Sequence, residues 1–213
     1  MPDSAKPQAR NKRDRKATEA SIVAAFETVL LREGVQGLGI NAVAQEAGVN
    51  KVLIYRYFHD FTGLARHWVS NGSFWPDAIE LIGGDPEAFE KLELDERICV
   101  VLDNYIGAIR ARPLTVEILA SEITKPNELT RTLVEGMVQF GKGVGDYIKQ
   151  ETDDRDRSDK IWALIYLVTA VTTFFAVRER YNPRFLGLDL SEDESWEFMR
   201  KAIAEMAAKY LKD

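Results

Sequence analysis

The chain has very little cysteine and histidine, and this scarcity excludes several kinds of site. Cys99 is the single cysteine among 213 residues, so no disulfide can form within the chain, as is usual for proteins of the reducing cytosol. The two histidines, His59 and His67, are not part of a His/Cys cluster with metal-ligand spacing. The sequence therefore predicts no metal site.

Motifs of enzymes and of exported proteins are missing as well. The chain has no glycine-rich loop of phosphate-binding pattern and no nucleophile elbow. Glu117 and Glu122 are isolated carboxylates, which are more typical of surface charges or ligand partners than of catalysis. No apolar signal-peptide region accompanies the polar, basic residues 1–15. We expect a cytoplasmic protein without a cofactor, with an enzyme as the less favoured alternative.

Charge is unevenly distributed along a chain that is acidic as a whole. The net charge is −6, yet residues 1–66 hold 10 Lys and Arg against 7 Asp and Glu, whereas the remaining residues hold 18 against 27. A basic N-terminal part on an acidic remainder is typical of a DNA-binding module fused to a second domain. Chance clustering on a solvated surface would give the same counts, so charge alone does not decide.

Residues 43–58 have the pattern of two short helices joined by a tight turn. Gly48 can take the left-handed conformation that ends a helix, and Asn50 is a good N-cap for the next one. In that second helix Ile54 and Phe58 are four residues apart and face inward. The outward side then carries Lys51, Val52, Tyr55 and Arg56. Such a face on a second helix is typical of a DNA-reading helix-turn-helix.

Apolar residues recur at helical spacing along the rest of the chain, without a convincing strand alternation. We expect an all-α fold of about nine helices: 18–33, 39–47, 50–59, one from 62, 94–110, 113–122, one from 126, 161–177 and 191–212. The expected domains are a flexible basic arm (1–16), a three-helix head (17–66) and a helical body (67–213). The arm would neutralise DNA phosphates or act as a solubilising tail.

The last two expected helices are the most informative part of the body. Ile161–Val177 is an apolar run of 17 residues, at the lower limit for a membrane span, but interrupting threonines and the lack of a topogenic pattern favour a buried helix. The final helix, opened by a capping box of Ser191 and Glu194, has apolar steps of three and four. We predict that both helices pair with a second copy of the chain, with packing within one chain as the alternative. The predicted pairing residues are Ile161, Ile165, Val168, Thr172, Trp196, Met199, Ile203, Met206 and Tyr210.

Aromatic side chains in the body suggest a site for a small apolar or aromatic effector. The candidates are Tyr105, Phe140, Trp162, Tyr166, Phe174 and Phe175. Binding there would be coupled to the head through the fourth helix. The alternative is that these aromatic residues form plain core.

The head resembles the TetR family of bacterial transcriptional repressors in its motif, Ala44-x-x-Ala47-Gly48-Val49-Asn50-x-x-x-Ile54-Tyr55-x-Tyr57-Phe58 after a first helix ending in Gly34. The motif match covers residues 17–66, and the body is similar to the family only in its helix count and its two long final helices. The resemblance implies a homodimeric repressor that binds a palindromic operator in double-stranded DNA and is released by a small molecule. The implied DNA contacts are Lys51, Val52 and Leu53 nearest the bases, Tyr55 and Tyr57 on phosphates, and Asn50, Arg56 and His59 at further backbone positions.

Three places depart from the family pattern. Gly39 stands where a hydroxyl residue often caps the second helix, and Phe61 where a lysine commonly contacts phosphate. Val52 and Leu53 replace small or hydroxyl-bearing residues and would pack against thymine methyl groups. Because polar contacts are lost, we expect affinity to depend more on the arm. A helix-turn-helix used for protein interaction, without sequence-specific DNA binding, is the second alternative.

Overall fold

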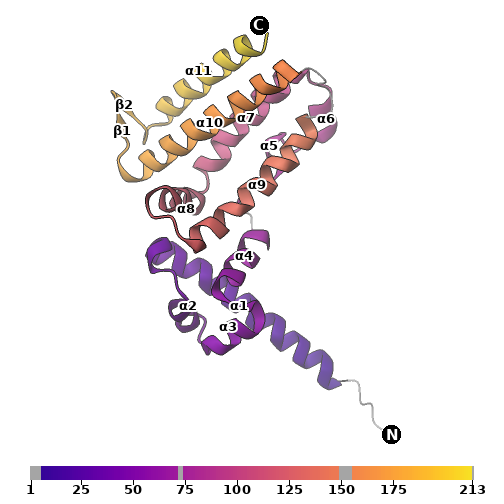
Figure 1. Ribbon diagram of the computed structural model, residues 1–213, viewed down its shortest axis with the longest axis vertical. Coiled ribbons are helices and arrows are strands. Elements are labelled where there is room, and N and C mark those ends of the chain that lie inside the picture. The colour runs from indigo at the N-terminus through magenta and orange to yellow at the C-terminus, as the bar shows by residue number, and fades with distance from the viewer. Residues whose placement is uncertain (1–5, 72–73, 149–154, 213) are drawn as a thin grey trace. The chain divides into compact units, whose positions relative to one another are not determined.

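The computed structural model describes residues 6–71, 74–148 and 155–212, with the backbone alone for residues 6–14, 136–142, 146 and 148. The described residues form eleven helices and one two-stranded ribbon (Figure 1), which confirms the expected all-α class. The chain separates into two compact units, residues 1–72 with 126–133 and residues 73–125 with 134–213. The flexibility of the arm stays a prediction, and helix α1 begins within the arm, at Lys6.

The first unit is built on four helices: α1 (Lys6–Gly37), α2 (Ile40–Glu46), α3 (Lys51–Phe58) and α4 (Phe61–Asn71). Both α1 and α3 pack against α2 and α4. The ring of Phe26 on α1 lies 5.8 Å from that of Phe61 and 5.3 Å from that of Trp68, so three aromatic side chains join α1 to α4. Gly34 was expected to end the first helix. The backbone of Gly34 is indeed non-helical, with φ of 67° and ψ of −177°, so the regular helix ends there, and a short further helical stretch within α1 reaches Gly37.

The last residue of α3 and the first turn of α4 lie close together at the corner between the two helices. His59 follows α3 with φ of 69°, a left-handed value that is uncommon for residues other than glycine. Asp60 then accepts a hydrogen bond from the backbone N–H of Gly63 at 2.6 Å, which satisfies a donor in the first turn of α4. A Cβ atom at residue 63 would lie 2.0 Å from the carbonyl oxygen of Phe58. Only glycine fits there.

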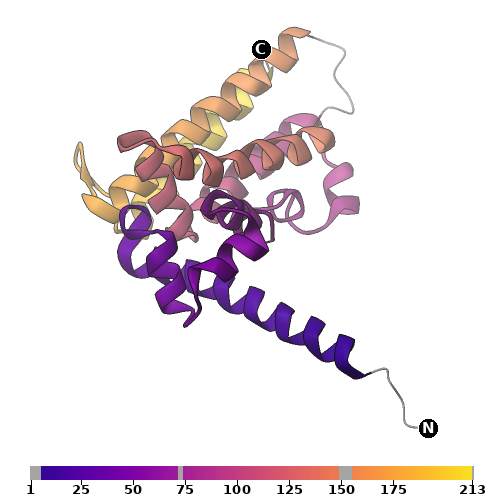
Figure 2. The ribbon, with the colours of Figure 1, turned by 60° about the horizontal axis from the view of Figure 1, so that its bottom comes forward.

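The second unit is arranged around α7. Its elements are α5 (Ala78–Leu81), α6 (Pro86–Glu90), α7 (Leu94–Arg110), α8 (Pro113–Thr124), α9 (Glu128–Ile148, which starts in the first unit), α10 (Arg155–Tyr181), β1 (Arg184–Phe185), β2 (Leu188–Asp189) and α11 (Asp193–Lys212). Helix α7 packs against α5, α8, α10 and α11, so it is buried on several sides. Figures 1 and 2 both show α10 and α11 side by side, joined at one end by the ribbon.

Local features account for the differences from the expected helices. The one-turn helices α5 and α6 lie between the fourth expected helix and the one at 94–110, where no helix was expected, which explains why there are more than about nine. The ribbon was not expected; its turn has positive φ at Leu186 (48°) and Gly187 (90°), as a two-residue hairpin requires. Ser191 does not cap α11, which begins at Asp193. Its hydroxyl donates to Asp189 at 2.6 Å.

Helix α10 is long and apolar enough to cross a membrane by length and composition, the one such helix in the described part of the chain. A third of its most apolar window is buried within the structure. It packs against α7, α8 and α11. These contacts fit the expected core helix of a bundle, although much of its apolar surface stays exposed.

Tyr105 is one of the α7 side chains that this packing buries. Burial raises the pKa of its phenol to about 12, although hydrogen bonding to Thr173 and Thr169 of α10 opposes the rise. Tyr105 was predicted to bind the effector. Its side chain instead belongs to the core between α7 and α10.

Replacing Gly63 tests the close corner. We expect Gly63→Ala to lower the free energy of unfolding by about 1–3 kcal/mol, because the added methyl group overlaps backbone that cannot move aside cheaply. Gly107→Ala in α7 is the control, since a Cβ there meets no atom within 4 Å. Chemical denaturation followed by circular dichroism measures both. Equal stability of Gly63→Ala and the unaltered chain would contradict the close contact.

Buried Tyr105 predicts a loss of stability in alkali. Folding raises the pKa of this phenol from its ordinary value of 10.0 to about 12, so its contribution is complete below pH 10 and is lost as pH rises to about 12. The free energy of unfolding should fall by about 2–3 kcal/mol more across this range than in Tyr105→Phe. Denaturation at several pH values measures the difference. Parallel curves for the two proteins would exclude a buried phenol.

Candidate nucleic-acid interface and body pocket

Helix α3 presents one face to the core and one to solvent. Ile54 and Phe58 are buried against the rest of the first unit, as the sequence predicted. The opposite side is exposed and carries Lys51, Val52, Tyr55 and Arg56. This combination of apolar, aromatic and cationic side chains on a short helix suits contact with the bases and phosphates of DNA.

The turn before α3 has the expected local structure. Gly48 has φ of 64°, and the N–H of Val49 donates to the carbonyl of Ala44 at 3.0 Å, which closes the end of α2. The side chain of Asn50 accepts a hydrogen bond from the N–H of Val52 at 2.9 Å and so caps α3. As expected, Gly39 gives α2 no side-chain cap.

The remaining candidates of the interface lie at its margins. Leu53 and Tyr57 are half-buried, whereas His59 is exposed at the end of α3. The guanidinium of Arg15, on α1, lies 5.4 Å from the ring centre of Tyr57. The sequence placed Arg15 in the arm but gave no signal for this contact, because the two residues lie far apart along the chain.

Phe61 is one of the three departures from the family pattern, and its packing accounts for the apolar residue at this position. Its ring packs against Phe26 at 5.8 Å and is half-buried. The position therefore contributes to the joint between α1 and α4. A phosphate contact from residue 61 is replaced by core packing.

Of the nine predicted pairing residues, five are buried within the second unit. These are Ile161, Val168, Thr172, Trp196 and Ile203. Ile165 and Met199 are half-buried, and Met206 and Tyr210 are exposed. On α11 the predicted pairing residues lie along the border between the buried and the exposed sides of the helix. Apolar residues cover more of the circumference of α11 than its contacts within the chain bury.

The exposed apolar side chains of the last two helices define what we call the outer faces of α10 and α11. On α10 we take Tyr166, Leu167 and Phe174, leaving out exposed Tyr181 at the helix end because its hydroxyl donates to Glu117, and on α11 we take Phe198, Met206 and Tyr210. The three on α11 are separated by multiples of four residues and so form one ridge. Pairing with a second copy of the chain stays a prediction, and the exposed residues of the outer faces are now its candidate contacts.

The predicted effector residues do not gather in one pocket among the described side chains. Trp162 and Tyr166 stack at 5.9 Å, and Tyr166 is largely exposed. Phe174 and Phe175 pack against Phe185 of the ribbon at 5.3 and 5.6 Å. The side chain of Phe140 lies outside the described part. Helical spacing identified aromatic residues but not which side of each helix meets a neighbour.

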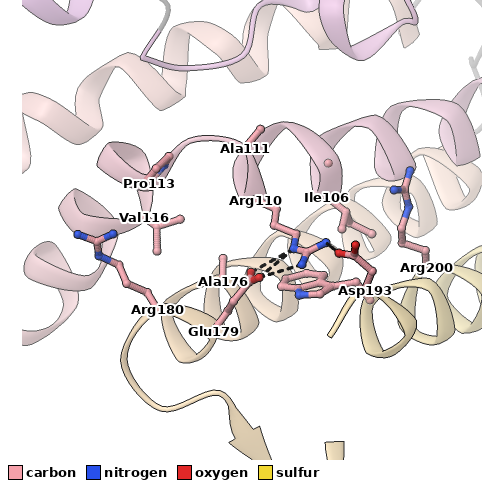
Figure 3. Close-up of a pocket in the computed structure, with 12 residues that line it drawn as sticks. Ile106, Arg110, Ala111, Pro113, Val116, Ala176, Glu179, Arg180, Asp193 and Arg200 are labelled. Carbon is pink, nitrogen blue, oxygen red and sulfur yellow. Dashed lines mark hydrogen bonds and ion pairs between the residues drawn. The ribbon is translucent and has the colours of Figure 1, made fainter. Parts of the chain in front are cut away.

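A pocket of about 710 Å³ instead lies where the ends of α7 and α10 meet the starts of α8 and α11 (Figure 3). Its lining consists of Ile106, Gly107, Arg110, Ala111, Pro113, Val116, Ala176, Glu179, Arg180, Asp193, Trp196 and Arg200. The volume is in the range of pockets that bind small molecules. Trp196, predicted to pair with a second copy, is one of its walls.

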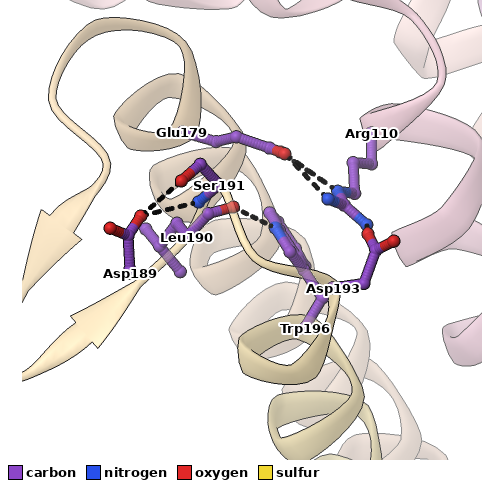
Figure 4. Close-up of polar contacts among 7 residues, drawn as sticks. All are labelled: Arg110, Glu179, Asp189, Leu190, Ser191, Asp193 and Trp196. Carbon is purple, nitrogen blue, oxygen red and sulfur yellow. Dashed lines mark hydrogen bonds and ion pairs between the residues drawn. The ribbon is translucent and has the colours of Figure 1, made fainter.

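Arg110 occupies the centre of this pocket and joins three helices (Figures 3 and 4). It donates to Glu179 of α10 from Nε at 3.0 Å and Nη2 at 2.9 Å, and to Asp193 of α11 from Nη1 at 2.6 Å. Its guanidinium lies 5.2 Å from the ring centre of Trp196. Hydrogen bonds to Glu179 and then to Asp193 raise the pKa of Arg110. The sequence gave no signal for this network.

The head and the whole chain are both similar to known proteins. Residues 22–66 match the family described as bacterial regulatory proteins, tetR family. No curated protein matches the sequence. Three solved structures are similar in fold, each with a TM-score of 0.53. The first is described as a TetR-family transcriptional regulator from Rhodococcus sp., is 18% identical, and is matched over 87% of this chain and 96% of that chain.

The second is HlyIIR, a hemolysin II transcriptional regulator, 15% identical over 93% of this chain and 99% of that chain. The third is the fatty acid degradation regulator FadR from Bacillus halodurans, 12% identical over 89% of this chain and 97% of that chain. The matched family and these structures are described as regulatory proteins, which favours a transcription regulator over the enzyme alternative. Residues 22–66 of this chain therefore match the tetR family of bacterial regulatory proteins, and the whole chain shares the fold of solved structures described as transcriptional regulators.

Proposed function

We propose that the chain is a cytoplasmic repressor that binds a palindromic operator as a homodimer and leaves it when a small molecule binds the second unit. The observation that carries the proposal is the outward face of α3. Lys51, Tyr55 and Arg56 are exposed on a helix held by its buried Ile54 and Phe58. Such a helix fits the major groove.

The outward side chains of α3 and the half-buried Tyr57 divide by chemistry into two roles. Lys51 and Val52, at its N-terminal end, would reach base edges, with Val52 against a thymine methyl group. Tyr55, Arg56 and the Tyr57 hydroxyl would contact phosphates and fix the register. The side-chain oxygen of Asn50 already accepts from Val52, so its amide group would serve any phosphate contact.

The outer faces of α10 and α11 support the proposed homodimer. Six large apolar side chains exposed on two adjacent helices are more than a solitary soluble protein usually carries in one region. A second copy would cover them in a four-helix arrangement with two-fold symmetry. Two heads related in this way would read half-sites about one helical turn of DNA apart.

Coupling between the effector and the head was expected to run through α4. Helix α9 is a second route that we propose, since its first residues, 128–133, belong to the first unit and the rest to the second. Its start is well fixed, because Asn127 and Thr130 exchange hydrogen bonds of 2.9 Å. A rigid helix shared by two units can transmit displacement from one to the other.

Two substitutions separate phosphate contacts from base contacts. Arg56→Gln should weaken binding to all DNA sequences and reduce the slope of log affinity against log salt by about 0.9. Val52→Ala should keep that slope and cost about 1 kcal/mol only at operators with the contacted A·T pair. Exposed Lys91→Gln in the second unit is the control with the same loss of charge.

Fluorescence anisotropy against an operator selected from random DNA measures these effects. Association that is insensitive to salt and indifferent to sequence would refute the proposal and favour the protein-interaction alternative.

One charge placed on the outer face of α11 tests the homodimer. Phe198→Glu should raise the dissociation constant of the dimer at least about tenfold, because pairing would bury the new carboxylate. Leu31→Glu, at an exposed leucine of α1, is the matched control and should leave the dimer intact. Sedimentation equilibrium gives both constants. A monomeric unaltered chain, or a Phe198→Glu dimer of unchanged affinity, would remove these faces from the interface.

A further inference from the structure

The walls of the body pocket bring three arginines together in a part of the chain that is acidic. After residue 66 the chain has 18 Lys and Arg against 27 Asp and Glu, yet three guanidinium groups and two carboxylates line the pocket. Glu117, which pairs with Arg180 at 3.3 Å, is outside the lining, as is Asp103, which pairs with Arg200 at 2.6 Å. Both lining carboxylates contact Arg110. Each guanidinium of the wall is therefore paired with at least one carboxylate, and a ligand anion reaches it only by replacing that partner.

The two carboxylates on Arg110 are held to different degrees. Glu179 accepts from two nitrogens of the guanidinium, and its side chain is 24% exposed. Asp193 accepts from Nη1 alone, and its side chain is 87% exposed. An ion pair that is so open to solvent contributes little to stability, so another anion can take the place of Asp193 at small cost. Nη1 of Arg110 is thus the exchangeable donor of the pocket.

Apolar surface lies next to this donor. Ile106, Val116 and Ala176 line the pocket from α7, α8 and α10 (Figure 3). The ring centre of Trp196 lies 5.2 Å from the Arg110 guanidinium. Gly107 and Ala111 are small, which keeps the space beside Arg110 open. A ligand that matches these walls has an apolar body and one anionic group. A neutral head would accept only a weaker hydrogen bond from Nη1, and a cationic head would be repelled by it.

We propose that this pocket binds a carboxylate with an apolar body, whose carboxylate replaces Asp193 on Arg110. The inference rests on the proposed function in taking this ligand as the effector. Asp193 is the first residue of α11, and α11 carries one of the outer faces proposed to pair with a second copy. Exchange at Arg110 releases the start of this helix from α7, so binding alters the spacing of the two heads.

Three probes with the same apolar body test the chemistry: octanoate, 1-octanol and octylamine. Isothermal titration calorimetry on the full chain without DNA should show octanoate binding at least about tenfold more tightly than 1-octanol, because a hydrogen bond to a charged group is made. Octylamine should bind least tightly. Since no DNA is present, a failure of operator binding leaves this result unaffected.

Two variants of the pocket should change octanoate affinity in opposite directions. Arg110→Gln should lose octanoate binding, whereas Asp193→Asn should bind it several-fold more tightly because the competing carboxylate is gone. Arg157→Gln, whose arginine pairs with Asp95 at 2.7 Å away from the pocket, is the control and should bind octanoate normally. The opposite sign for Asp193→Asn keeps the test valid even if Arg110→Gln folds poorly.

The inference is overturned if 1-octanol or octylamine binds as tightly as octanoate. It is equally overturned if Asp193→Asn binds octanoate no more tightly than the unaltered chain. Failure of operator release with octanoate bound would contradict the role of the ligand as effector.

Discussion

The contact between residue 63 and the carbonyl oxygen of Phe58 is the constraint on which the reading helix depends. A glycine there lets α4 begin directly against the end of α3, and Asp60 holds the corner with a hydrogen bond. Side chains on α3 have defined positions only if the helix itself cannot tilt. Because Ile54 and Phe58 are buried and the corner is closed, the exposed residues keep a fixed orientation, which groove recognition requires.

The second unit depends on a different interaction, the burial of α7 among four other helices. One end of α7 carries Arg110, which contacts both of the final helices. Apolar packing places these helices, whereas the ion pairs define where their ends lie relative to α7 and leave a pocket of about 710 Å³ between them. The pocket and the outer faces therefore share the same two helices.

This shared use links the proposed parts of the mechanism. A symmetric dimer reads two half-sites only at one spacing, so a small displacement of the pairing helices is enough to lower operator affinity. Asp193 would make such a displacement depend on what occupies Arg110. The exposed position of Asp193 suits that role, because a deeply buried ion pair would resist exchange.

The helix-turn-helix could be predicted from the sequence because its signals are local. Gly48, Asn50, Ile54 and Phe58 determine the turn, the cap and the inward face within a few residues of each other. Helix α7 was predicted with the bounds Leu94–Arg110 for the same reason. Predictions failed where a local sequence pattern was compatible with two different structures. Ser191 fitted a capping box by spacing but forms part of the connection to Asp189.

Only the tertiary structure decided which sides of α10 and α11 are inside and which residues form the pocket. Both helices are apolar around much of their circumference, so periodicity could not separate Trp196, which is buried, from Met206, which is exposed. Arg110 meets Glu179 and Asp193 across 69 and 83 residues of sequence. Backbone preferences and helical spacing act over a few residues. Contacts over such separations arise from the packing of whole helices.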